Sequence, residues 1–215
     1  MLLALAHAPA GPRPVTQITG IILCGGRGRR LGGADKPLQL WRGQTLAARV
    51  AERLRPQVNA LLISANRNLD AYRLLAPVVA DELPPHQGPL AGVAAALRRC
   101  ATPLALVCPG DAPLVPLDLA KRLHARLAAH PAESSPLVAA AHDGERRHPL
   151  HCLLRSEAIG SLDRYLASGG RAAHGWLDSM GAVDVQFKGQ EEAFRNFNSR
   201  QDFEEIPAPA KEKPS

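Results

Sequence analysis

The sequence has few aromatic residues, no closely spaced cysteine pair and no long apolar run. Aromatic side chains make up 4% of it, so the stacking surfaces that bind single-stranded nucleic acids are scarce. No apolar run approaches the roughly 20 residues of a membrane-spanning helix, which excludes a helical membrane protein. The four cysteines show no CxxC spacing, which argues against a zinc knuckle and favours a reducing, cytoplasmic setting.

The composition is that of a folded chain with a modest excess of positive charge. Hydrophobic residues are 46% and charged residues 21% of the 215 residues, which predicts one domain with a sizeable core. Lys plus Arg exceed Asp plus Glu by 26 − 20 = 6, which suits an anionic ligand such as a phosphate. We expect residues 1–17 to form a flexible extension rather than a secretion signal, because a basic n-region is missing. Residues 18–206 would form a single domain, and residues 207–215 a disordered tail.

Short apolar runs alternate with helical patterns along the domain. Strands are predicted at 18–24, 60–64, 78–80, 104–108, 137–141, 150–154 and 183–187, and helices at 45–54, 69–75, 90–100, 117–129, 156–167 and 173–179. This alternation predicts a three-layer, Rossmann-like α/β fold with a mostly parallel central sheet. Ligands of such sheets bind at the carboxyl ends of the strands. The loops after Cys24, Ser64, Ala80 and Cys108 are therefore the candidate binding loops.

The loop after the first strand is rich in glycine and arginine. It reads Leu23-Cys-Gly-Gly-Arg-Gly-Arg-Arg-Leu-Gly-Gly-Ala-Asp-Lys36. Glycines let the backbone approach a ligand, and successive N–H groups can surround an anion, so the loop suits a polyphosphate. A solvated basic connector is the plainer alternative. A Walker A loop is excluded because Gly33 is not followed by Lys and Ser or Thr, and the GxGxxG spacing of dinucleotide folds is missed by one residue.

The same loop resembles the signature of the nucleotidyltransferase superfamily, and most closely that of the molybdenum cofactor guanylyltransferase family. That signature is roughly Leu-Ala-Gly-Gly-x-x-x-Arg-Met-Gly-x-Asp-Lys, from which this chain departs at Cys24 and Leu31. The resemblance continues in order through five further segments and covers about residues 18–206. These segments are Ser64-Ala-Asn-Arg67, Gly88-Pro-Leu-Ala-Gly92, Cys108-Pro-Gly-Asp-Ala-Pro113, His142-Asp-Gly-Glu-Arg-Arg-His-Pro149 and Phe194-Arg-Asn-Phe-Asn-Ser199.

The resemblance implies a set of nucleotide contacts. The loop residues Leu23, Cys24, Gly25 and Gly26 would bind GTP through the backbone. Lys36 would reach its phosphates, and Arg30 would meet the leaving pyrophosphate, although Arg27 or Arg29 could serve instead. Asp81 would accept hydrogen bonds from guanine, or it is a surface turn residue. Gly88 and Gly92 would let the backbone approach the base or ribose, or they serve a turn and close helix packing. Ser64 stands where the family has Asn.

Metal and acceptor contacts follow from the same comparison. Asp111 comes directly after an apolar strand, where a carboxylate suits Mg²⁺ beside phosphates. The alternative is an Asp that caps the following helix. Arg146 and His148 would lie on the acceptor side, and Asn196 and Asn198 would face one side of an extended segment near the active site. His148-Pro-Leu-His151 has no accompanying Cys or Glu pattern, so we do not interpret it as a metal site.

The function that the resemblance implies is transfer of GMP from GTP to molybdenum-molybdopterin, with Mg²⁺ as cofactor and pyrophosphate as product. Proteins for cofactor delivery or molybdoenzyme maturation would be partners, and neither nucleic acid nor a membrane is expected. Three alternatives remain open at this point. They are a molybdopterin cytidylyltransferase, a non-catalytic regulator that binds guanine nucleotides, and a nucleic-acid-binding protein suggested only by the positive charge.

Overall fold

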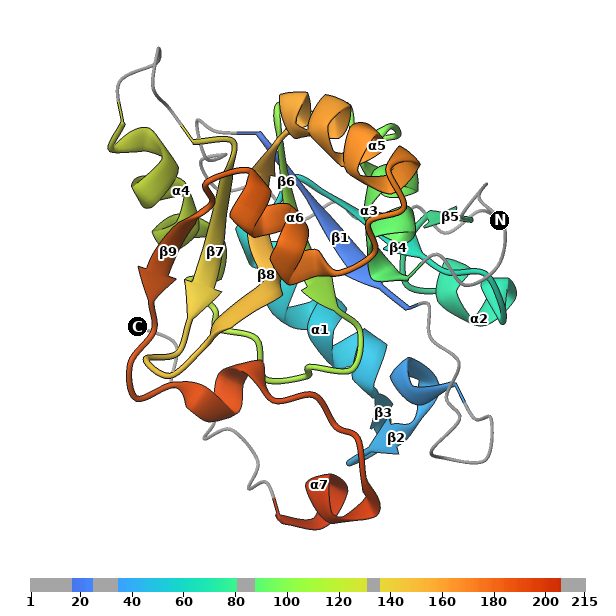
Figure 1. Cartoon of the computed structure of the whole chain (residues 1–215). Coiled ribbons are helices and arrows are strands. Elements are labelled where there is room, and N and C mark those ends of the chain that lie inside the picture. Colours follow the sequence, from blue (N-terminus) through green and yellow to red (C-terminus); the bar gives the residue numbers. More distant parts are fainter. Residues whose placement is uncertain (1–16, 25–34, 81–87, 131–135, 206–215) are drawn as a thin grey trace, which may run out of the picture.

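A seven-stranded sheet lies in the middle of the molecule, with helices on both of its faces (Figure 1). The computed structural model describes residues 17–24, 35–80, 88–130 and 136–205. The extension expected at residues 1–17 lies outside this part of the chain apart from Gln17, and the tail expected at 207–215 lies wholly outside it. In the described ranges, no helix has the length and apolar character needed to cross a membrane.

The strand order of the sheet is β5-β4-β1-β6-β8-β7-β9. Its strands are β1 (Ile18–Leu23), β4 (Ala60–Ser64), β5 (Val78–Val79), β6 (Leu104–Pro109), β7 (Val138–His142), β8 (Arg147–Arg155) and β9 (Val183–Gln186). Strand β8 runs antiparallel to β6 and β7, and all other neighbours in the sheet are parallel. The predicted mostly parallel α/β sheet is therefore confirmed.

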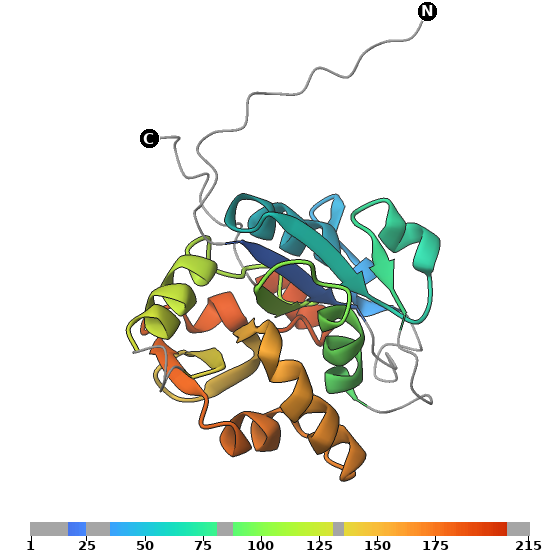
Figure 2. The same ribbon diagram turned by 90° about the horizontal axis from the view of Figure 1, so that it is seen from above.

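Two groups of helices bury the two faces of the sheet (Figure 2). The helices are α1 (Leu46–Leu54), α2 (Leu69–Arg73), α3 (Pro89–Leu97), α4 (Leu119–Ala128), α5 (Ile159–Ala167), α6 (Ala173–Ser179) and α7 (Arg200–Glu205). One apolar cluster joins α1 and α4 to the sheet, and a second joins α3, α5 and α6 to its other face. Each cluster takes alternate side chains of β1, such as Ile22 in the first and Ile21 in the second, as expected for a strand covered on both sides.

Local chemistry explains where the helices begin. The Thr45 hydroxyl accepts a hydrogen bond from the Ala48 N–H at 3.2 Å, so Thr45 is the N-cap and α1 begins at Leu46. The apolar positions predicted for this helix are all buried, including Val50 and Leu54. Gly88 precedes α3 with a φ of +80°, a conformation that a side chain would strain.

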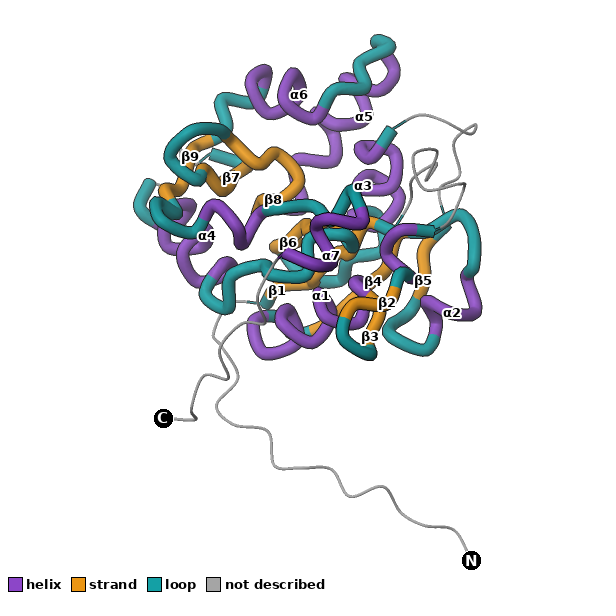
Figure 3. The backbone as a smooth tube through the Cα atoms, turned by 90° about the horizontal axis from the view of Figure 1, so that it is seen from below, coloured by secondary structure: helices purple, strands orange, loops and turns teal. Residues whose placement is uncertain are grey.

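Several short elements were not predicted from the sequence. They are the hairpin of β2 (Leu40–Trp41) and β3 (Gln44–Thr45), helix α7, and single 3₁₀ turns at Lys36–Leu38, Arg55–Gln57 and Glu191–Phe194. A further 3₁₀ turn at Ser156–Ala158 forms the start of the helix predicted at 156–167. The hairpin and α7 lie together at one end of the sheet, because Trp41, Leu46 and Phe197 form a third small apolar cluster there. Figure 3 looks onto this end, with α7 and the hairpin close to α1.

Candidate active site

The candidate active site begins where β1 ends between two parallel neighbours. The Cys24 N–H donates to the Ser64 carbonyl at 2.8 Å, and the Gly110 N–H donates to the Leu23 carbonyl at 2.9 Å. The Cys24 thiol is buried, and burial together with the nearby Asp35 carboxylate raises its pKa, so it is not a nucleophile. The predicted phosphate contacts Gly25, Gly26 and Arg30, together with Arg27 and Arg29, lie outside the described residues, as does Asp81.

Gly110 allows the end of β6 to lie directly against the end of β1. A Cβ at Gly110 would lie 2.7 Å from Cys24 Sγ, closer than real Cβ contacts, and 3.1 Å from the Leu23 carbonyl oxygen, which is a tight contact. Glycine at this position therefore lets the strand ends approach each other without displacing Cys24. As a result, Asp111 lies beside the point where the glycine-rich loop leaves β1.

Asp111 is a partly buried carboxylate at the carboxyl end of β6. Burial raises its pKa above the usual value, and the ammonium of Lys36 opposes that effect. A carboxylate in such a position is stabilised in its charged form by a further cation. The backbone of Asp111 is also engaged, because its carbonyl accepts the Phe197 N–H at 2.9 Å.

Lys36 and Asn198 meet at this same place although they are 162 residues apart. The Lys36 ammonium donates to the Asn198 side-chain oxygen at 2.5 Å. Three segments of the chain thus bring Lys36, Asp111 and Asn198 together: the 3₁₀ turn at Lys36–Leu38, the residues after β6, and the extended segment after the turn at Glu191–Phe194. The structure places these three sequence-predicted residues in one site.

Asp35, the residue before Lys36, is held by the chain after β4. Its buried carboxylate accepts from the Asn68 amide at 2.9 Å and lies 3.5 Å from the Arg67 guanidinium. Asn68 has a φ of +52°, which Asn tolerates better than most residues. These contacts tie the base of the lysine turn to the Ser64–Arg67 motif. The role of Asp35 was not predicted, although it belongs to the same signature loop.

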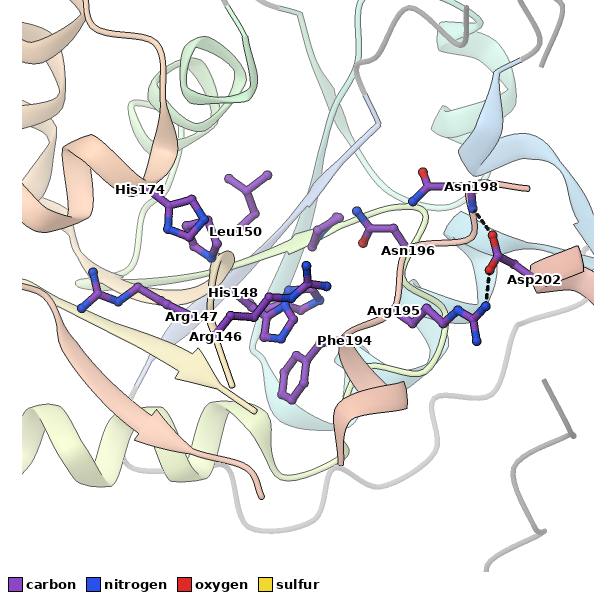
Figure 4. A pocket seen from close by; sticks show the side chains of 13 residues that line it. Arg146, Arg147, His148, Leu150, His174, Phe194, Arg195, Asn196, Asn198 and Asp202 are labelled. Atoms are coloured by element: carbon purple, nitrogen blue, oxygen red, sulfur yellow. Dashed lines mark hydrogen bonds and ion pairs between the residues drawn. The ribbon is translucent and has the colours of Figure 1, made fainter. Parts of the chain in front are cut away.

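Residues 195–199 form an extended segment along the edge of the site. Phe197 is fully buried, whereas Asn196 and Asn198 are exposed, as their alternation predicts. The Asp202 carboxylate accepts from the backbone N–H groups of Asn198 and Ser199, both at 2.7 Å, and from the Ser199 hydroxyl. The Arg195 guanidinium lies 2.7 Å from the same carboxylate. Figure 4 shows Asp202 between Asn198 and Arg195, so one side chain organises the turn that carries both asparagines.

A pocket of about 490 Å³ opens beside this segment. Its lining comprises Pro109, Arg146, Arg147, His148, Pro149, Leu150, His151, His174, Phe194, Arg195, Asn196, Asn198 and Asp202. The asparagines lie on one side and the Arg146, His148 and His174 side chains on the other (Figure 4). Arg147 is bonded to Asp178 and Asp184, both at 2.5 Å, whereas the Arg146 side chain is 73% exposed and lies 4.0 Å from Asp143. Arg146 is therefore the arginine of this pair with its charge available to an anion.

An irregularity in β8 forms the floor of the pocket. Strand β8 begins at Arg147, earlier than the predicted 150, and its register with β7 jumps between the pairs Ala140–Cys152 and Ala141–His148. Pro149 lies in the jump and has no N–H to give to a neighbouring strand. The residues Pro149 to His151 consequently leave the ladder and line the pocket.

His148 belongs to a buried network rather than to an open metal site. Its Nε2 lies 2.7 Å from the Asp143 carboxylate, and its ring stacks on Phe194 at 4.7 Å. Burial alone would raise the pKa of Asp143, but hydrogen bonds from the Arg146 N–H, His148 and the Glu145 N–H hold it at about 2. Burial lowers the pKa of His148, and burial beside His148 lowers that of His151 to about 3, so both imidazoles are neutral at pH 7.

The remaining predicted contacts surround the start of α3. Ser64 is buried, and a Cβ at Gly92 would lie 2.4 Å from its hydroxyl oxygen, so the small size of Gly92 allows α3 to pack on β4. Asn66 is exposed near the end of β4. Gly88 lies at the entrance to α3, next to residues outside the described ranges.

Sequence reasoning missed three groups that shape this site. Asp202 has a recognisable signal, because Ser199-x-x-Asp202 has the spacing of a capping box at a helix start. Asp143 also has one, since Asp followed by Gly is typical of a turn. Trp41 has none, because a single tryptophan in an unpredicted hairpin shows no periodic pattern.

Comparison with known proteins agrees with this geometry. The family described as "MobA-like NTP transferase domain" matches residues 20–183. A protein named molybdenum cofactor guanylyltransferase from Ralstonia nicotianae is 43% identical over 192 residues, which are 86% of this chain and 94% of that one. A protein of the same name from Cupriavidus taiwanensis is 44% identical over 184 residues, 85% of this chain and 92% of that one.

Solved structures with the same fold include molybdopterin-guanine dinucleotide biosynthesis protein A from Archaeoglobus fulgidus. Its TM-score is 0.68 at 23% identity, over 86% of this chain and 95% of that one. A nucleotidyl transferase from Methanothermobacter thermautotroptrophicus has a TM-score of 0.66 at 20% identity, over 87% of this chain and 94% of that one. The long matches at over 40% identity carry the assignment, and the structures show the fold. The chain therefore belongs to the MobA-like NTP transferase family, which confirms the resemblance that its ordered motifs indicate.

Proposed function

We propose that this nucleotidyltransferase transfers GMP from GTP to molybdenum-molybdopterin, forms the guanine dinucleotide cofactor and releases pyrophosphate. The observation that carries the proposal is the convergence of Lys36, Asp111 and Asn198 at the carboxyl ends of β1 and β6, beside a pocket with an available arginine. The relatives that share over 40% of the sequence are named for the same guanylyl transfer.

The chemistry needs alignment and charge neutralisation more than a catalytic base. A phosphate monoester on the acceptor is already ionised at neutral pH, so its oxygen can attack the α-phosphorus of GTP directly. The new P–O bond forms as the bond to the β-phosphate oxygen breaks, and pyrophosphate leaves with the electron pair. Lys36 would bind the phosphate oxygens as a point charge, and the amides of Gly25 and Gly26 would surround them. Arg30 would meet the leaving pyrophosphate.

The donor set at Asp111 fits a magnesium ion. Mg²⁺ is bound by one or two carboxylates together with substrate phosphates and water, rather than by a full protein cage. Among the described residues, no group of three His, Cys, Asp or Glu side chains is gathered. The Asp111 carbonyl accepts the Phe197 N–H, so the oxygen donors beside the Asp111 carboxylate would come from the adjoining segment that carries Asn196 and Asn198. These hard oxygen donors suit Mg²⁺, which when bound supplies positive charge against the phosphate oxygens.

The guanine base would be recognised by a second set of residues, at the end of the nucleotide opposite its phosphates. Asp81 would accept the two donors of the guanine edge, and Leu23, Cys24 and Gly88 would offer backbone contacts. Gly92 packs on Ser64, so its contribution would be to bring α3 close to the nucleotide. A site built around such hydrogen bonds discriminates against bases that leave its polar groups unpaired.

The acceptor would enter the pocket between β8 and the asparagine segment. Arg146 would bind its phosphate, His148 would hold the turn that carries Arg146, and Asn196 and Asn198 would line the opposite wall. Proteins that deliver the acceptor or mature molybdoenzymes would be the partners that such a cofactor-forming reaction needs.

Substrate choice is tested with the full chain, Mg²⁺ and molybdopterin phosphate. Each of the four nucleoside triphosphates is supplied separately, and dinucleotide formation and pyrophosphate release are measured. We expect clear preference for GTP, eroded by Asp81→Ala. Equal or better use of CTP would favour the cytidylyltransferase alternative, and GTP binding without pyrophosphate release would favour a regulator. Arg73→Ala, which alters an exposed ion pair on α2, serves as the matched control.

A further inference from the structure

Trp41 and Phe197 join the two chain segments that supply Lys36 and Asn198. The rings of Trp41 and Phe197 are 5.0 Å apart between centroids and meet edge to face at 71°. Both side chains are buried, and Phe203 of α7 meets Phe197 at 5.3 Å. Leu46 completes the cluster from the start of α1. This aromatic cluster, defined by Trp41, Leu46, Phe197 and Phe203, is separate from the two clusters that bury the sheet.

Polar contacts hold the segment at both ends. Asp202 accepts the N–H groups of Asn198 and Ser199, and the exposed Lys36 ammonium donates to the Asn198 side chain. The Phe197 N–H bond to the Asp111 carbonyl fixes one point of the segment. Buried aromatic side chains contribute as well, because each removes about 150–250 Å² of surface from water. The packing of Phe197 on Trp41 therefore acts together with the Asp202 and Asp111 contacts to fix where Asn196 and Asn198 lie.

Trp41 acts here through its ring rather than through its N–H. The indole nitrogen is buried and has no hydrogen-bond partner among the described residues. The guanidiniums of Arg42 and Arg49 lie over the ring at 5.1 and 4.8 Å, and Arg49 also donates to the Trp41 carbonyl. A ring held in this way is a fixed surface for Phe197. Phenylalanine at position 41 would preserve an aromatic surface without the unsatisfied donor.

We propose that Trp41 and Phe197 are positioning residues for nucleotidyl transfer. Their contact holds the Asn196–Asn198 segment against the carboxyl ends of β1 and β6, so that the Asn198 side chain can bond to Lys36 beside Asp111. The kinetic consequence of this inference rests on the proposed function, but the position of the Asn196–Asn198 segment is a property of the fold alone. Neither aromatic residue touches the reacting atoms; each acts through the asparagines and Lys36.

The experiment compares Trp41→Ala, Trp41→Phe and the wild-type chain by two independent measurements. The exchange rate of the Phe197 backbone N–H reports whether the segment is held in place, because this N–H is protected only while it is bonded to the Asp111 carbonyl. Steady-state transfer with GTP reports the chemistry. For Trp41→Ala we expect exchange at Phe197 at least about tenfold faster, unchanged protection in β1 and β6, and a kcat about 10- to 100-fold lower. The KM for GTP should change less than about threefold, and Trp41→Phe should restore most of both signals.

Trp176→Ala is the matched control, since it removes the other tryptophan from the cluster on the α3 and α5 face. It should lower the melting temperature but leave Phe197 exchange and kcat near wild type. An equal loss of kcat in Trp176→Ala would assign the effect to general destabilisation and overturn the proposal. If Trp41→Ala fails to fold, Phe197→Leu, which keeps an apolar side chain, supplies the same two readouts.

The two measurements separate failure of this inference from failure of the proposed function. Unchanged exchange at Phe197 in Trp41→Ala, or fast exchange with a wild-type kcat, would overturn the positioning role while leaving guanylyl transfer intact. A wild-type chain that transfers no nucleotide from GTP would overturn the proposed function. In that case the hydrogen-exchange measurement alone decides whether Trp41 holds the Asn196–Asn198 segment in place.

Discussion

The proposed nucleotide side and the proposed acceptor side of the site, called below the nucleotide side and the acceptor side, are built on different kinds of strand. On the nucleotide side, Cys24 directly follows β1 and Asp111 lies two residues after β6, which is parallel to β1. On the acceptor side, His148 lies inside β8, which runs antiparallel to its neighbours and is interrupted at Pro149. The ends of adjacent parallel strands bring their loops to the same edge of the sheet. Here, by contrast, the antiparallel strand β8 lines the pocket at the point where its pairing with β7 is interrupted.

The two sides also balance charge differently. On the nucleotide side a cation and a carboxylate oppose each other, since Lys36 acts against the raised pKa of Asp111. On the acceptor side the carboxylates of Asp178 and Asp184 bind Arg147, and Arg146 stays exposed. The first arrangement can accommodate a metal–phosphate complex, and the second presents positive charge to an anionic acceptor. Substitutions on the two sides should therefore affect different kinetic constants.

The largest effect is expected at the carboxylate of the nucleotide side. Asp111→Asn keeps the shape and removes the charge, so transfer should fall at least about 100-fold, the cost of losing one key electrostatic contact. The fold should persist, because the Asp111 carbonyl still accepts the Phe197 N–H. Asp118→Asn is the control, since Asp118 is a carboxylate before α4 whose side chain caps no N–H. Near-normal transfer by folded Asp111→Asn would exclude Asp111 as the metal ligand.

The same contrast explains how much was predictable from the sequence. The run from Ile18 to Leu23 is mostly apolar and is buried throughout, so the strand and its depth were predicted from the sequence, whereas the glycine loop after it lies outside the described residues. Lys36 and Asp111 were identified because they follow such strands within matched motifs. Their contact with Asn198 was not foreseen, since no local pattern reports a partner 162 residues away.

The acceptor side was predicted less well because its structure depends on tertiary contacts. Strand β8 extends back to Arg147, past a proline that propensity alone places outside a strand. The β2–β3 hairpin is too short to show alternation, and Trp41 acquires its role only by meeting Phe197. Helix α7 did have a local signal in Ser199 and Asp202, which the periodicity of apolar residues does not detect.

The second-largest effect on transfer is expected at the hydrogen bond between Lys36 and Asn198, which joins the two sides of the site. Lys36→Ala and Asn198→Ala should each lower kcat/KM for GTP about tenfold or more, because each removes a polar group beside Asp111. The double variant should lose less than the product of the two losses, since the side chains contact each other. Purely multiplicative losses would show that the two residues act independently. Melting curves of all three variants serve as the folding control.

A smaller and more selective effect is expected at Arg146. Arg146→Ala should raise the KM for the molybdopterin acceptor about tenfold and leave GTP affinity unchanged, because Arg146 is exposed in the pocket on the side opposite Asn198, the residue that Lys36 contacts. Kinetics with each substrate varied separately measure the difference. Arg98→Ala, at an exposed ion pair with Asp163, provides a matched loss of one surface charge. A rise in the KM for GTP instead would place Arg146 on the nucleotide side and remove the distinction between the two walls.

The smallest effect on catalysis, but a measurable one on stability, is expected at His151 beneath the acceptor pocket. The pKa of His151 is lowered to about 3 in the folded chain, so between that value and the ordinary pKa of about 6.5 only the unfolded chain binds the proton. Its contribution to stability is therefore fully present above about pH 6.5 and is lost as the pH falls, by about 2 kcal/mol at pH 5. The pKa of His148 is lowered as well, whereas Asp143, with a pKa of about 2, loses its contribution to stability only at more acidic pH.

His151→Phe removes the titrating group and keeps a ring against Phe194. The unfolding free energy of this variant should therefore fall less than that of the wild type between about pH 7.5 and about pH 5. Denaturant titrations at both pH values measure this, with His124→Gln on α4 as the control that should keep the wild-type dependence. The same pH dependence in His151→Phe as in the wild type would show that another group accounts for the acid sensitivity.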